Sequence, residues 1–279
     1  MSSIMAADVL RHRRPFLFID YVTMRSQGCA VADLAPELWT KVTPWRAPEA
    51  MSALPIELAA QVAGVALRTR WSTAFSAGFL AAVSSYRVFS GLHEATQIEV
   101  NLGKSAGAYH AFEAVLTAST GAPCAEVFGS IFLGASDATS AASKQLAAPT
   151  PASTHATAEA AQESCWLDPA QSFYAGHFPE APITPGVLLL EMAAQVSSSI
   201  AQAEGQRVLG LAEVTNAVFQ RLVPPGAMVE VRARLQASNV GRRNYAVSLF
   251  FEGARALRAR VALRTANDDF DFDGVKNAI

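Results

Sequence analysis

The chain has 279 residues, of which 51% are hydrophobic and only 16% charged, and its net charge is −2. This composition can bury a large core, excludes disordered and fibrous proteins, and gives no reason to expect nucleic-acid binding. The three cysteines are far apart and form no CxxC pair, which predicts reduced thiols and neither a disulfide framework nor a zinc site.

The first residues, MSSIMAADVLRHRR, contain no apolar stretch of the kind found in signal peptides. The most apolar stretch of the chain, residues 187–200, is interrupted by Glu191 and Gln195. It is also shorter than the roughly 20 apolar residues that a membrane-spanning helix needs. We therefore expect a cytoplasmic protein without membrane insertion.

A segment without apolar periodicity divides the chain into halves of similar size. Residues 135–163 consist almost entirely of Ala, Ser, Thr, Pro and Gln, a composition typical of linkers. The last residues, 268–279, are rich in aspartate and predict a loose acidic tail. We therefore expect two domains, residues 1–134 and 164–267, joined by a linker.

The two halves carry a worn internal repeat. The sequence Glu57-Leu-Ala-Ala-Gln61 in the first half matches Glu191-Met-Ala-Ala-Gln195 in the second. An Ala-Pro pair precedes each copy at the same distance, and the offset is 134 residues throughout (57 to 191 and 61 to 195). An ordered series of matches indicates that both halves share one fold.

Each half combines a mostly apolar helix with several β-rich runs. Helices are expected over residues 55–69 and 185–204. The second helix has Thr184 as its expected N-cap, Pro185 at the first helical position and Gly205 beyond its end. Strands are expected where β-branched and aromatic residues alternate with polar ones, at 88–100, 111–117, 127–133, 228–235, 245–251 and 257–264. Because a helix that is apolar nearly all round must be buried, we expect an α+β fold with antiparallel strands wrapped around each helix.

A glutamate on such a helix is costly to bury without a partner. Here it occurs at the same place in both halves, as Glu57 and Glu191, each with a glutamine one helical turn later. The pattern has two interpretations. Each carboxyl could form a structural pair with its glutamine and a backbone donor, or it could serve as an acid–base group in an active site.

The segment from Phe173 to Glu191, FYAGHFPEAPITPGVLLLE, favours the active site. It resembles the signature G-H-F-P-x-x-P-x-x-P-G-V-x-x-x-E of the 3-hydroxyacyl-acyl-carrier-protein dehydratases of bacterial fatty acid synthesis. The phrase HRRPFLFID from His12 and the phrase FxRxVxPG from Phe219 continue the resemblance. It implies a double hot-dog fold, with two antiparallel sheets each wrapped around a long central helix. The chain is similar to a fusion of the two-subunit dehydratases of aryl-polyene and related pathways, in which one partner is degenerate.

In this family, each active site takes its histidine from one hot dog and its acid from the facing one. The resemblance therefore implies that His177 is the catalytic base and Glu57 the acid, with Gln61 orienting the acid. The first half has Thr43 at the position that corresponds to His177. A mirror site of Thr43 and Glu191 is therefore expected to be dead. A His177–Glu191 pairing remains the alternative, because spacing alone does not exclude it.

The start of the second helix is expected to bind the thioester oxygen. Proline has no amide hydrogen, so the N–H of Gly186 is free at the positive end of the helix. A glycine there also lets the backbone approach the substrate. Phe178 and Pro179 complete the motif and are expected to support the histidine. The sequence has no glycine-rich phosphate loop and no cluster of metal ligands, so we expect no cofactor and no metal.

These residues predict the dehydration of a 3-hydroxyacyl thioester on acyl carrier protein to the trans-2-enoyl thioester, in fatty acid, polyketide or aryl-polyene biosynthesis. His177 would remove the proton next to the carbonyl, and Glu57 would protonate the departing hydroxyl. Two alternatives belong to other classes: a hot-dog acyl thioesterase, and a non-catalytic acyl-binding or partner subunit. A homo-oligomer of double hot dogs is compatible with the sequence.

The remaining basic residues are assigned lesser roles. His12 is expected to make a structural hydrogen bond, and His93, His110 and His155 are expected to be solvated. Several arginines are candidates for receiving an acidic carrier protein, although each is also compatible with a solvated surface charge. These are Arg13, Arg14, Arg221, Arg242 and Arg243.

Overall fold

The computed structural model describes residues 2–41, 52–71, 77–134 and 154–267. Thr43, the Ala47-Pro48 pair, the greater part of the predicted linker and the acidic tail lie outside the described residues.

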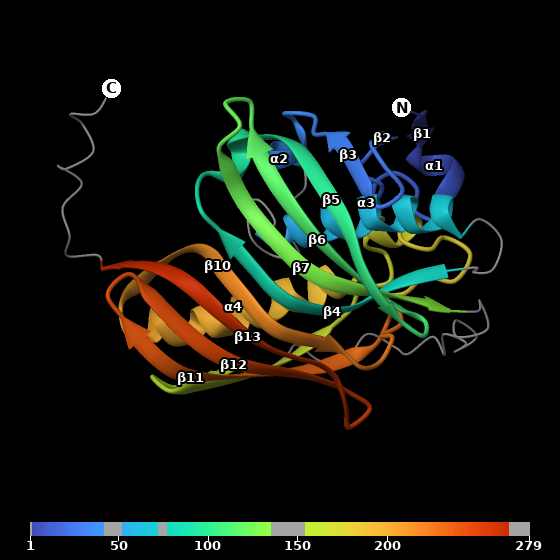
Figure 1. The fold of residues 1–279 in the computed structure, drawn as a ribbon. Coiled ribbons are helices and arrows are strands. Elements are labelled where there is room, and N and C mark those ends of the chain that lie inside the picture. The colour runs from blue at the N-terminus through green and yellow to red at the C-terminus, as the bar shows by residue number, and fades with distance from the viewer. Residues whose placement is uncertain (1, 42–51, 72–76, 135–153, 268–279) are drawn as a thin grey trace.

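The first half is a sheet wrapped around one long helix, α3 (Leu54–Arg70), as Figure 1 shows. Its strands are β1 (Ser2–Met5), β2 (Tyr21–Met24), β3 (Cys29–Asp33), β4 (Ala77–Val88), β5 (Ala95–Ala106), β6 (Tyr109–Ala118) and β7 (Pro123–Gly134). Its short helices are α1 (Ala6–Val9), α2 (Leu38–Lys41) and the 3-10 turn η1 (Leu92–Glu94).

The second half repeats this arrangement around helix α4 (Gly186–Ala203). Its strands are β8 (Thr154–Ala156), β9 (Ala160–Trp166), β10 (Gln206–Phe219), β11 (Met228–Asn239), β12 (Arg242–Phe251) and β13 (Ala254–Asn267). A 3-10 turn, η3 (Ser172–Ala175), precedes the helix.

The two sheets are continuous. In the described part of the chain, 13 strands form one sheet with the order β1-β2-β3-β5-β6-β7-β4-β10-β13-β12-β11-β9-β8. Counted outward from the central β4·β10 pair, the two halves have the same order, β4-β7-β6-β5-β3 and β10-β13-β12-β11-β9. This arrangement confirms the repeat and the α+β double hot dog, with one refinement: the two predicted sheets join edge to edge.

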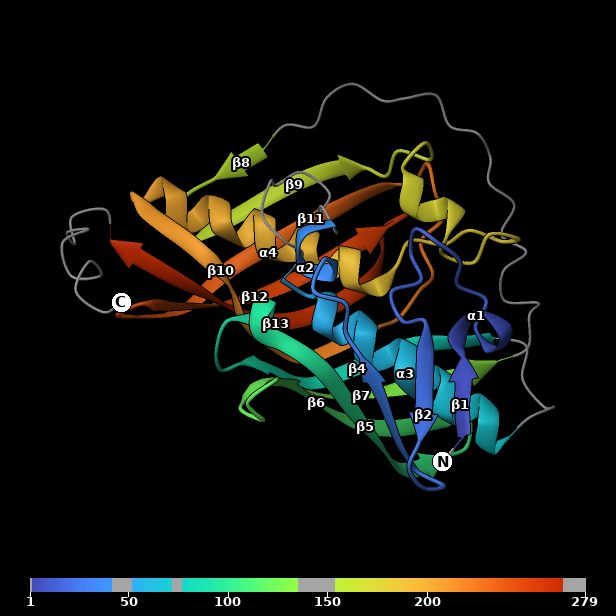
Figure 2. The same cartoon turned by 90° about the horizontal axis from the view of Figure 1, so that it is seen from above.

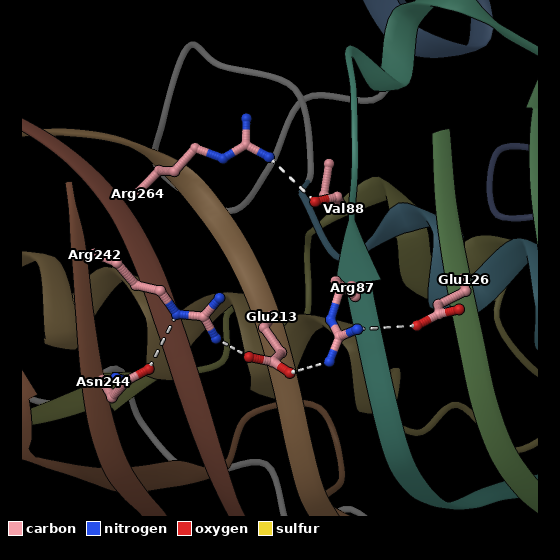
Figure 3. Close-up of polar contacts among 7 residues, drawn as sticks. All are labelled: Arg87, Val88, Glu126, Glu213, Arg242, Asn244 and Arg264. Atoms are coloured by element: carbon pink, nitrogen blue, oxygen red, sulfur yellow. Dashed lines mark hydrogen bonds and ion pairs between the residues drawn. The ribbon is translucent and has the colours of Figure 1, made fainter. Parts of the chain in front are cut away.

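Charged side chains bridge the seam between the halves on the outside of the sheet (Figure 3). Glu213 on β10 pairs with Arg87 on β4, 3.4 Å away, and also with Arg242 on β12. Arg264 on β13 donates a hydrogen bond to a carbonyl oxygen at the end of β4. Glu213 is only 14% exposed, but its partners Arg87 and Arg242 are 50% and 40% exposed, and ion pairs with such solvated partners contribute little. The seam therefore depends mainly on the β4·β10 backbone ladder, which pairs Val214 with Tyr86.

Both long helices are buried, because the sheet curls around them. Nearly every residue from Leu54 to Leu67 of α3 is buried, and burying a large aliphatic side chain contributes about 1.5–3 kcal/mol. The end of α4 is as predicted, since Gly205 follows it with a φ of +71°. Its start differs: Pro185 is the N-cap, and the Thr184 hydroxyl bonds Tyr174 instead. None of the described helices combines the length and apolarity needed to cross a membrane.

The linker prediction is wrong at its C-terminal end, because β8 lies within residues 135–163 and β9 begins there, at Ala160. Alanine, glutamine and glutamate have low strand propensity, but β9 pairs with β11 along its whole length and so takes its conformation from a neighbour. The expected strand 88–100 is likewise interrupted, since η1 separates β4 from β5.

Candidate active site

A cavity of about 1080 Å³, counting the part that is open to solvent, is lined by residues of both halves. The first half contributes His12 and Glu57, and the second contributes His177, Phe178 and Gly186. The structure therefore brings the predicted base and the predicted acid into one cavity, although 120 positions separate them in the chain (57 to 177).

A close backbone contact joins the halves beside the cavity. The Arg13 N–H donates a hydrogen bond of 2.7 Å to the carbonyl oxygen of Gly176. A Cβ on Gly176 would lie 2.3 Å from the Arg13 carbonyl oxygen and 2.5 Å from the Phe16 nitrogen, so only glycine fits. Figure 2 shows the dark blue loop that follows α1 beside the yellow segment that precedes α4. The contact fixes His177, the next residue, against the first half.

His177 has the tautomer that a base needs. Its Nδ1 lies 2.8 Å from the carbonyl oxygen of Ile183. Because a carbonyl oxygen only accepts hydrogen bonds, Nδ1 carries the proton and Nε2 keeps its lone pair. Burial, reinforced by the neighbouring His12, holds the pKa of His177 well below its usual value. The imidazole is therefore neutral at neutral pH and can accept a proton.

Glu57 lies in the first turn of α3, fully enclosed, with Gln61 one turn later. The Gln61 Nε2 donates to Glu57 Oε1 at 2.9 Å and to the Phe16 carbonyl oxygen at 2.9 Å. The Gln61 Oε1 accepts from the Phe18 N–H at 3.0 Å, which fixes the orientation of the amide. Burial raises the pKa of Glu57 to about 7 against the opposing effect of the Gln61 hydrogen bond. Near neutral pH, a substantial fraction of Glu57 therefore carries the proton that a general acid needs.

The start of α4 faces the same cavity. The first hydrogen bonds of the helix run from the N–H groups of Leu188 and Leu189 to the Pro185 carbonyl oxygen. The Gly186 N–H has no backbone partner among the described residues, and Gly186 lines the cavity. A Cβ there would approach the Phe219 ring to 2.9 Å, so close packing also requires glycine. An unpaired amide at a helix N-terminus can stabilise a developing oxyanion.

The two supporting residues of the motif differ in position. The Phe178 ring lies in the cavity, with its centroid 4.8 Å from that of His177 and 5.1 Å from that of His12. Its φ of +54° is left-handed, an unusual conformation for a non-glycine residue. Pro179 is exposed and does not line the cavity.

Glu191 does not line the cavity, because its carboxyl contacts the backbone at the start of α3. Its Oε1 accepts a hydrogen bond from the backbone N–H of Ala53, and the backbone of Ser52 also contacts the carboxyl. Ser52 occupies the position that corresponds to Gly186 in the 134-residue repeat. The carboxyl of Glu191 thus bonds the amides at the start of α3 that a mirror-site substrate would need. Burial raises the pKa of Glu191 to about 7 as well.

His12 lines the same cavity, and its side chain forms no hydrogen bond of ordinary length within the described residues, where the sequence predicted a structural one. Its Nδ1 is buried without a hydrogen-bond partner in the described part of the chain. Its Nε2 lies 3.5 Å from Glu57 Oε1, and its ring centroid lies 5.0 Å from that of His177. The position of His12 in the family's opening phrase was the one signal that could have identified it as part of the site.

Two other predictions need correction, and one holds. His110 is buried against Trp71 and bonds the Ser105 hydroxyl at 2.8 Å, so it is not solvated. Arg243 is buried and pairs with Glu204, so it cannot receive a partner protein. His93 is exposed as expected. Cys124 and Cys165 are buried, and Cys29 is partly buried. His155 belongs to β8, but its side chain lies outside the described part of the structure.

The other candidate arginines lie at the surface. Arg14 pairs with Asp20, and Arg242 pairs with Glu213. Arg13 bonds the carbonyl oxygens of Leu10 and His12. Arg221 alone among the five lines the cavity.

Comparison with known proteins supports the assignment of the second half. Residues 153–253 match the ApeI-like family, described as ApeI dehydratase. The 3-hydroxyacyl-acyl-carrier-protein dehydratase FabZ of Bartonella quintana is 33% identical over 93 residues, which are 32% of this chain and 60% of that protein. The chain thus spans about 60% of the length of this relative. These matches confirm the dehydratase resemblance for the second half.

Solved structures extend the similarity to the whole fold. The tesB protein of Mycobacterium avium subs paratuberculosis has a TM-score of 0.56 at 13% identity, covering 94% of this chain and 100% of that one. A MaoC-like dehydratase has a TM-score of 0.51 at 11% identity, covering 77% of this chain and 83% of that one. At such identities the likeness concerns the fold alone, and it establishes the double hot dog over both halves.

Proposed function

We propose that the chain is a 3-hydroxyacyl thioester dehydratase with one composite active site. The observation that carries this proposal is the shared cavity, which is lined by a neutral His177 from one half and a buried Glu57 from the other. We place the reaction in fatty acid, polyketide or aryl-polyene biosynthesis, in the cytoplasm, on substrates attached to acyl carrier protein. The similarity of the second half to FabZ supports the choice of carrier.

The reaction requires a base, an acid and a donor for the enolate oxygen. The Nε2 of His177 removes the proton next to the thioester carbonyl, and the Gly186 N–H stabilises the charge that develops on the carbonyl oxygen. As the carbon–carbon double bond forms, the bond to the 3-hydroxyl breaks and Glu57 protonates the leaving oxygen, which departs as water. Transfer of the proton from His177 back to Glu57 through solvent restores the site.

The inner part of the cavity suits an apolar acyl chain. It runs along one side of α3 toward β4 and β7, and its walls are mostly hydrocarbon. They include Leu67, Trp71, Phe79, Ile131 and Leu133. Three arginines, Arg11, Arg68 and Arg221, also line the cavity, and they are suited to an anionic carrier arm or an acidic carrier protein.

Gly64→Leu is expected to shorten the acyl cavity. Gly64 lines the cavity on α3, and even a Cβ there would lie 3.0 Å from a methyl group of Leu10. We expect kcat/KM for a long 3-hydroxyacyl chain to fall about tenfold or more, because the leucine occupies the volume of several methylenes. Steady-state rates with a long chain and with 3-hydroxybutyryl substrate measure the effect. Gly64→Ala serves as the smaller matched variant, and an equal loss for both chain lengths would place the acyl chain elsewhere.

The function itself is tested by incubating the protein with 3-hydroxyacyl-acyl carrier protein and following the mass of the acyl group. Loss of water with the thioester intact is the expected result. Release of the free thiol would instead indicate an acyl thioesterase. Tight binding without any change in mass would indicate a non-catalytic acyl-binding subunit.

A further inference from the structure

His12 occupies the space between the two proposed catalytic side chains. Its ring contacts His177 and Phe178 edge-on, and its Nε2 points toward Glu57 Oε1 at 3.5 Å. We propose that His12 is a positioning residue that acts through Glu57, donating a hydrogen bond from Nε2 to Oε1 and so directing the proton of the carboxyl onto Oε2. This inference rests on the dehydratase function proposed above.

The backbone fixes the position of His12. The residue after it, Arg13, bonds Gly176, which directly precedes His177. A side chain on Gly176 would collide with this segment. The contact that orients His177 therefore holds His12 at the same time, and the two imidazoles come from different halves of the chain.

A purely structural role does not account for burying this histidine. Its Nδ1 has no partner among the described residues, and an unsatisfied buried polar atom costs about 1–3 kcal/mol. A phenylalanine would fill the same space among Phe16 and Phe178 without that cost. The polar atom that does have a neighbour is Nε2, and the neighbour is the carboxyl of Glu57. The free-energy cost of burying the His12 imidazole therefore accompanies a contact between its Nε2 and the carboxyl of the proposed acid, Glu57.

The protonation states agree with this role. Burial, reinforced by Arg13, lowers the pKa of His12 to about 4, so the ring is neutral near pH 7 and donates through one nitrogen only. With the proton on Nε2, His12 and Gln61 are both placed toward Oε1, and no hydrogen bond to Oε2 is formed within the described part of the chain. A carboxylic acid whose Oε1 accepts two hydrogen bonds carries its proton on Oε2. That oxygen is then the one that can protonate the 3-hydroxyl.

The distance of 3.5 Å is longer than a hydrogen bond. Catalytic hydrogen bonds are often long in the free enzyme and shorten when substrate is bound. The titratable group nearest to Glu57 is His12, and Gln61 is the neutral donor on its own helix. The same cavity is also lined by His177, Arg11, Arg68 and Arg221. None of them is a second carboxylate that would compete for the proton.

The test compares His12→Phe, which keeps the aromatic packing, with His12→Gln, whose amide nitrogen can reach the position of Nε2. In His12→Phe we expect kcat to fall about tenfold, the rate equivalent of one hydrogen bond, with KM nearly unchanged. A donor to a carboxylate lowers its pKa, so its removal is expected to move the alkaline limb of the kcat–pH profile to higher pH. His12→Gln is expected to restore both kcat and the position of the alkaline limb of the kcat–pH profile.

A carboxyl-carbon NMR titration of Glu57 in the wild type and in His12→Phe provides a readout that is independent of activity. A higher Glu57 pKa in the variant supports the contact even if the wild type fails to dehydrate, an outcome that would refute only the proposed function. An unchanged kcat and titration in a folded His12→Phe protein would overturn the inference. A rate loss without a change in titration, or without rescue by His12→Gln, would also overturn it. If His12→Phe does not fold, His12→Gln provides the test. A kcat and an alkaline limb of the kcat–pH profile that both match the wild type support the inference, and a change in either contradicts it.

Discussion

Glu57→Gln is expected to reduce the kcat of dehydration by about 10²- to 10⁴-fold, the usual contribution of one acid–base group, whereas Glu191→Gln retains nearly all activity. The two glutamates occupy equivalent positions of the repeat and have the same raised pKa of about 7. They differ in location, since only Glu57 lines the cavity that contains His177. Single-turnover rates of water loss, measured with the purified variants, give the comparison.

Glu191→Gln is the matched control for Glu57→Gln, because both changes remove one buried carboxyl from equivalent positions of the repeat. His177→Ala completes the set and is expected to lose activity to a similar extent as Glu57→Gln. If Glu191→Gln were the inactive variant, the pairing across the two halves would be wrong. If both glutamine variants remained active, neither carboxyl could be the acid.

The contribution of Glu57 and Glu191 to stability toward unfolding is expected to fall as the pH rises from about 4.5 to about 7, and to level off above that. The lowered pKa values of His12 and His177 act in the opposite direction up to about pH 6.5, so the carboxyl contribution is measured by comparing variants with the wild type. Burial raises the pKa of Glu57 and of Glu191 from 4.5 to about 7. Between these values, the folded protein binds more protons than the unfolded chain, so each carboxyl stabilises the fold at low pH and loses that contribution as the pH approaches 7. At 1.36 kcal/mol for each pH unit, the loss is about 3 kcal/mol for each carboxyl.

Glu191→Gln is expected to remove this loss for one carboxyl. The amide oxygen of the variant can still accept the hydrogen bond from the Ala53 N–H. Urea unfolding should therefore show a variant that is about 3 kcal/mol more stable than the wild type above pH 7, with little difference near pH 4.5. Glu180→Gln, which removes a carboxyl that is 87% exposed, is the control. A Glu191→Gln protein that is less stable than the wild type at both pH values would mean that the start of α3 stabilises the ionised carboxylate more than burial penalises it.

The long helices and the catalytic motif could be predicted because their signals are local. The apolar runs around Glu57 and Glu191 correspond to α3 and α4 to within a few residues. The constant offset of the repeat indicated one fold used twice, and the strand order on each side of β4·β10 confirms it. The resemblance around His177 was equally local, and it suggested that the acid comes from the other half.

The features that could not be predicted from the sequence depend on contacts between segments that are distant in the chain. Strand β9 is alanine-rich and has no sequence pattern of its own, since its conformation comes from β11. His12 and His110 were misassigned for the same reason: only the fold places one beside Glu57 and the other against Trp71. The bond between Glu191 and the start of α3 was equally hidden, because it joins residues 138 positions apart.

The location of the proposed site across the β4·β10 seam affects how the protein behaves on dilution. A site built from two separate subunits disappears when the subunits dissociate. Here both halves belong to one polypeptide, so the seam closes intramolecularly at an effective concentration that does not depend on protein abundance. One translation event also supplies one acid-bearing half for every histidine-bearing half. The first half can therefore lose its own histidine motif without loss to the whole, because it never has to pair with a copy of itself.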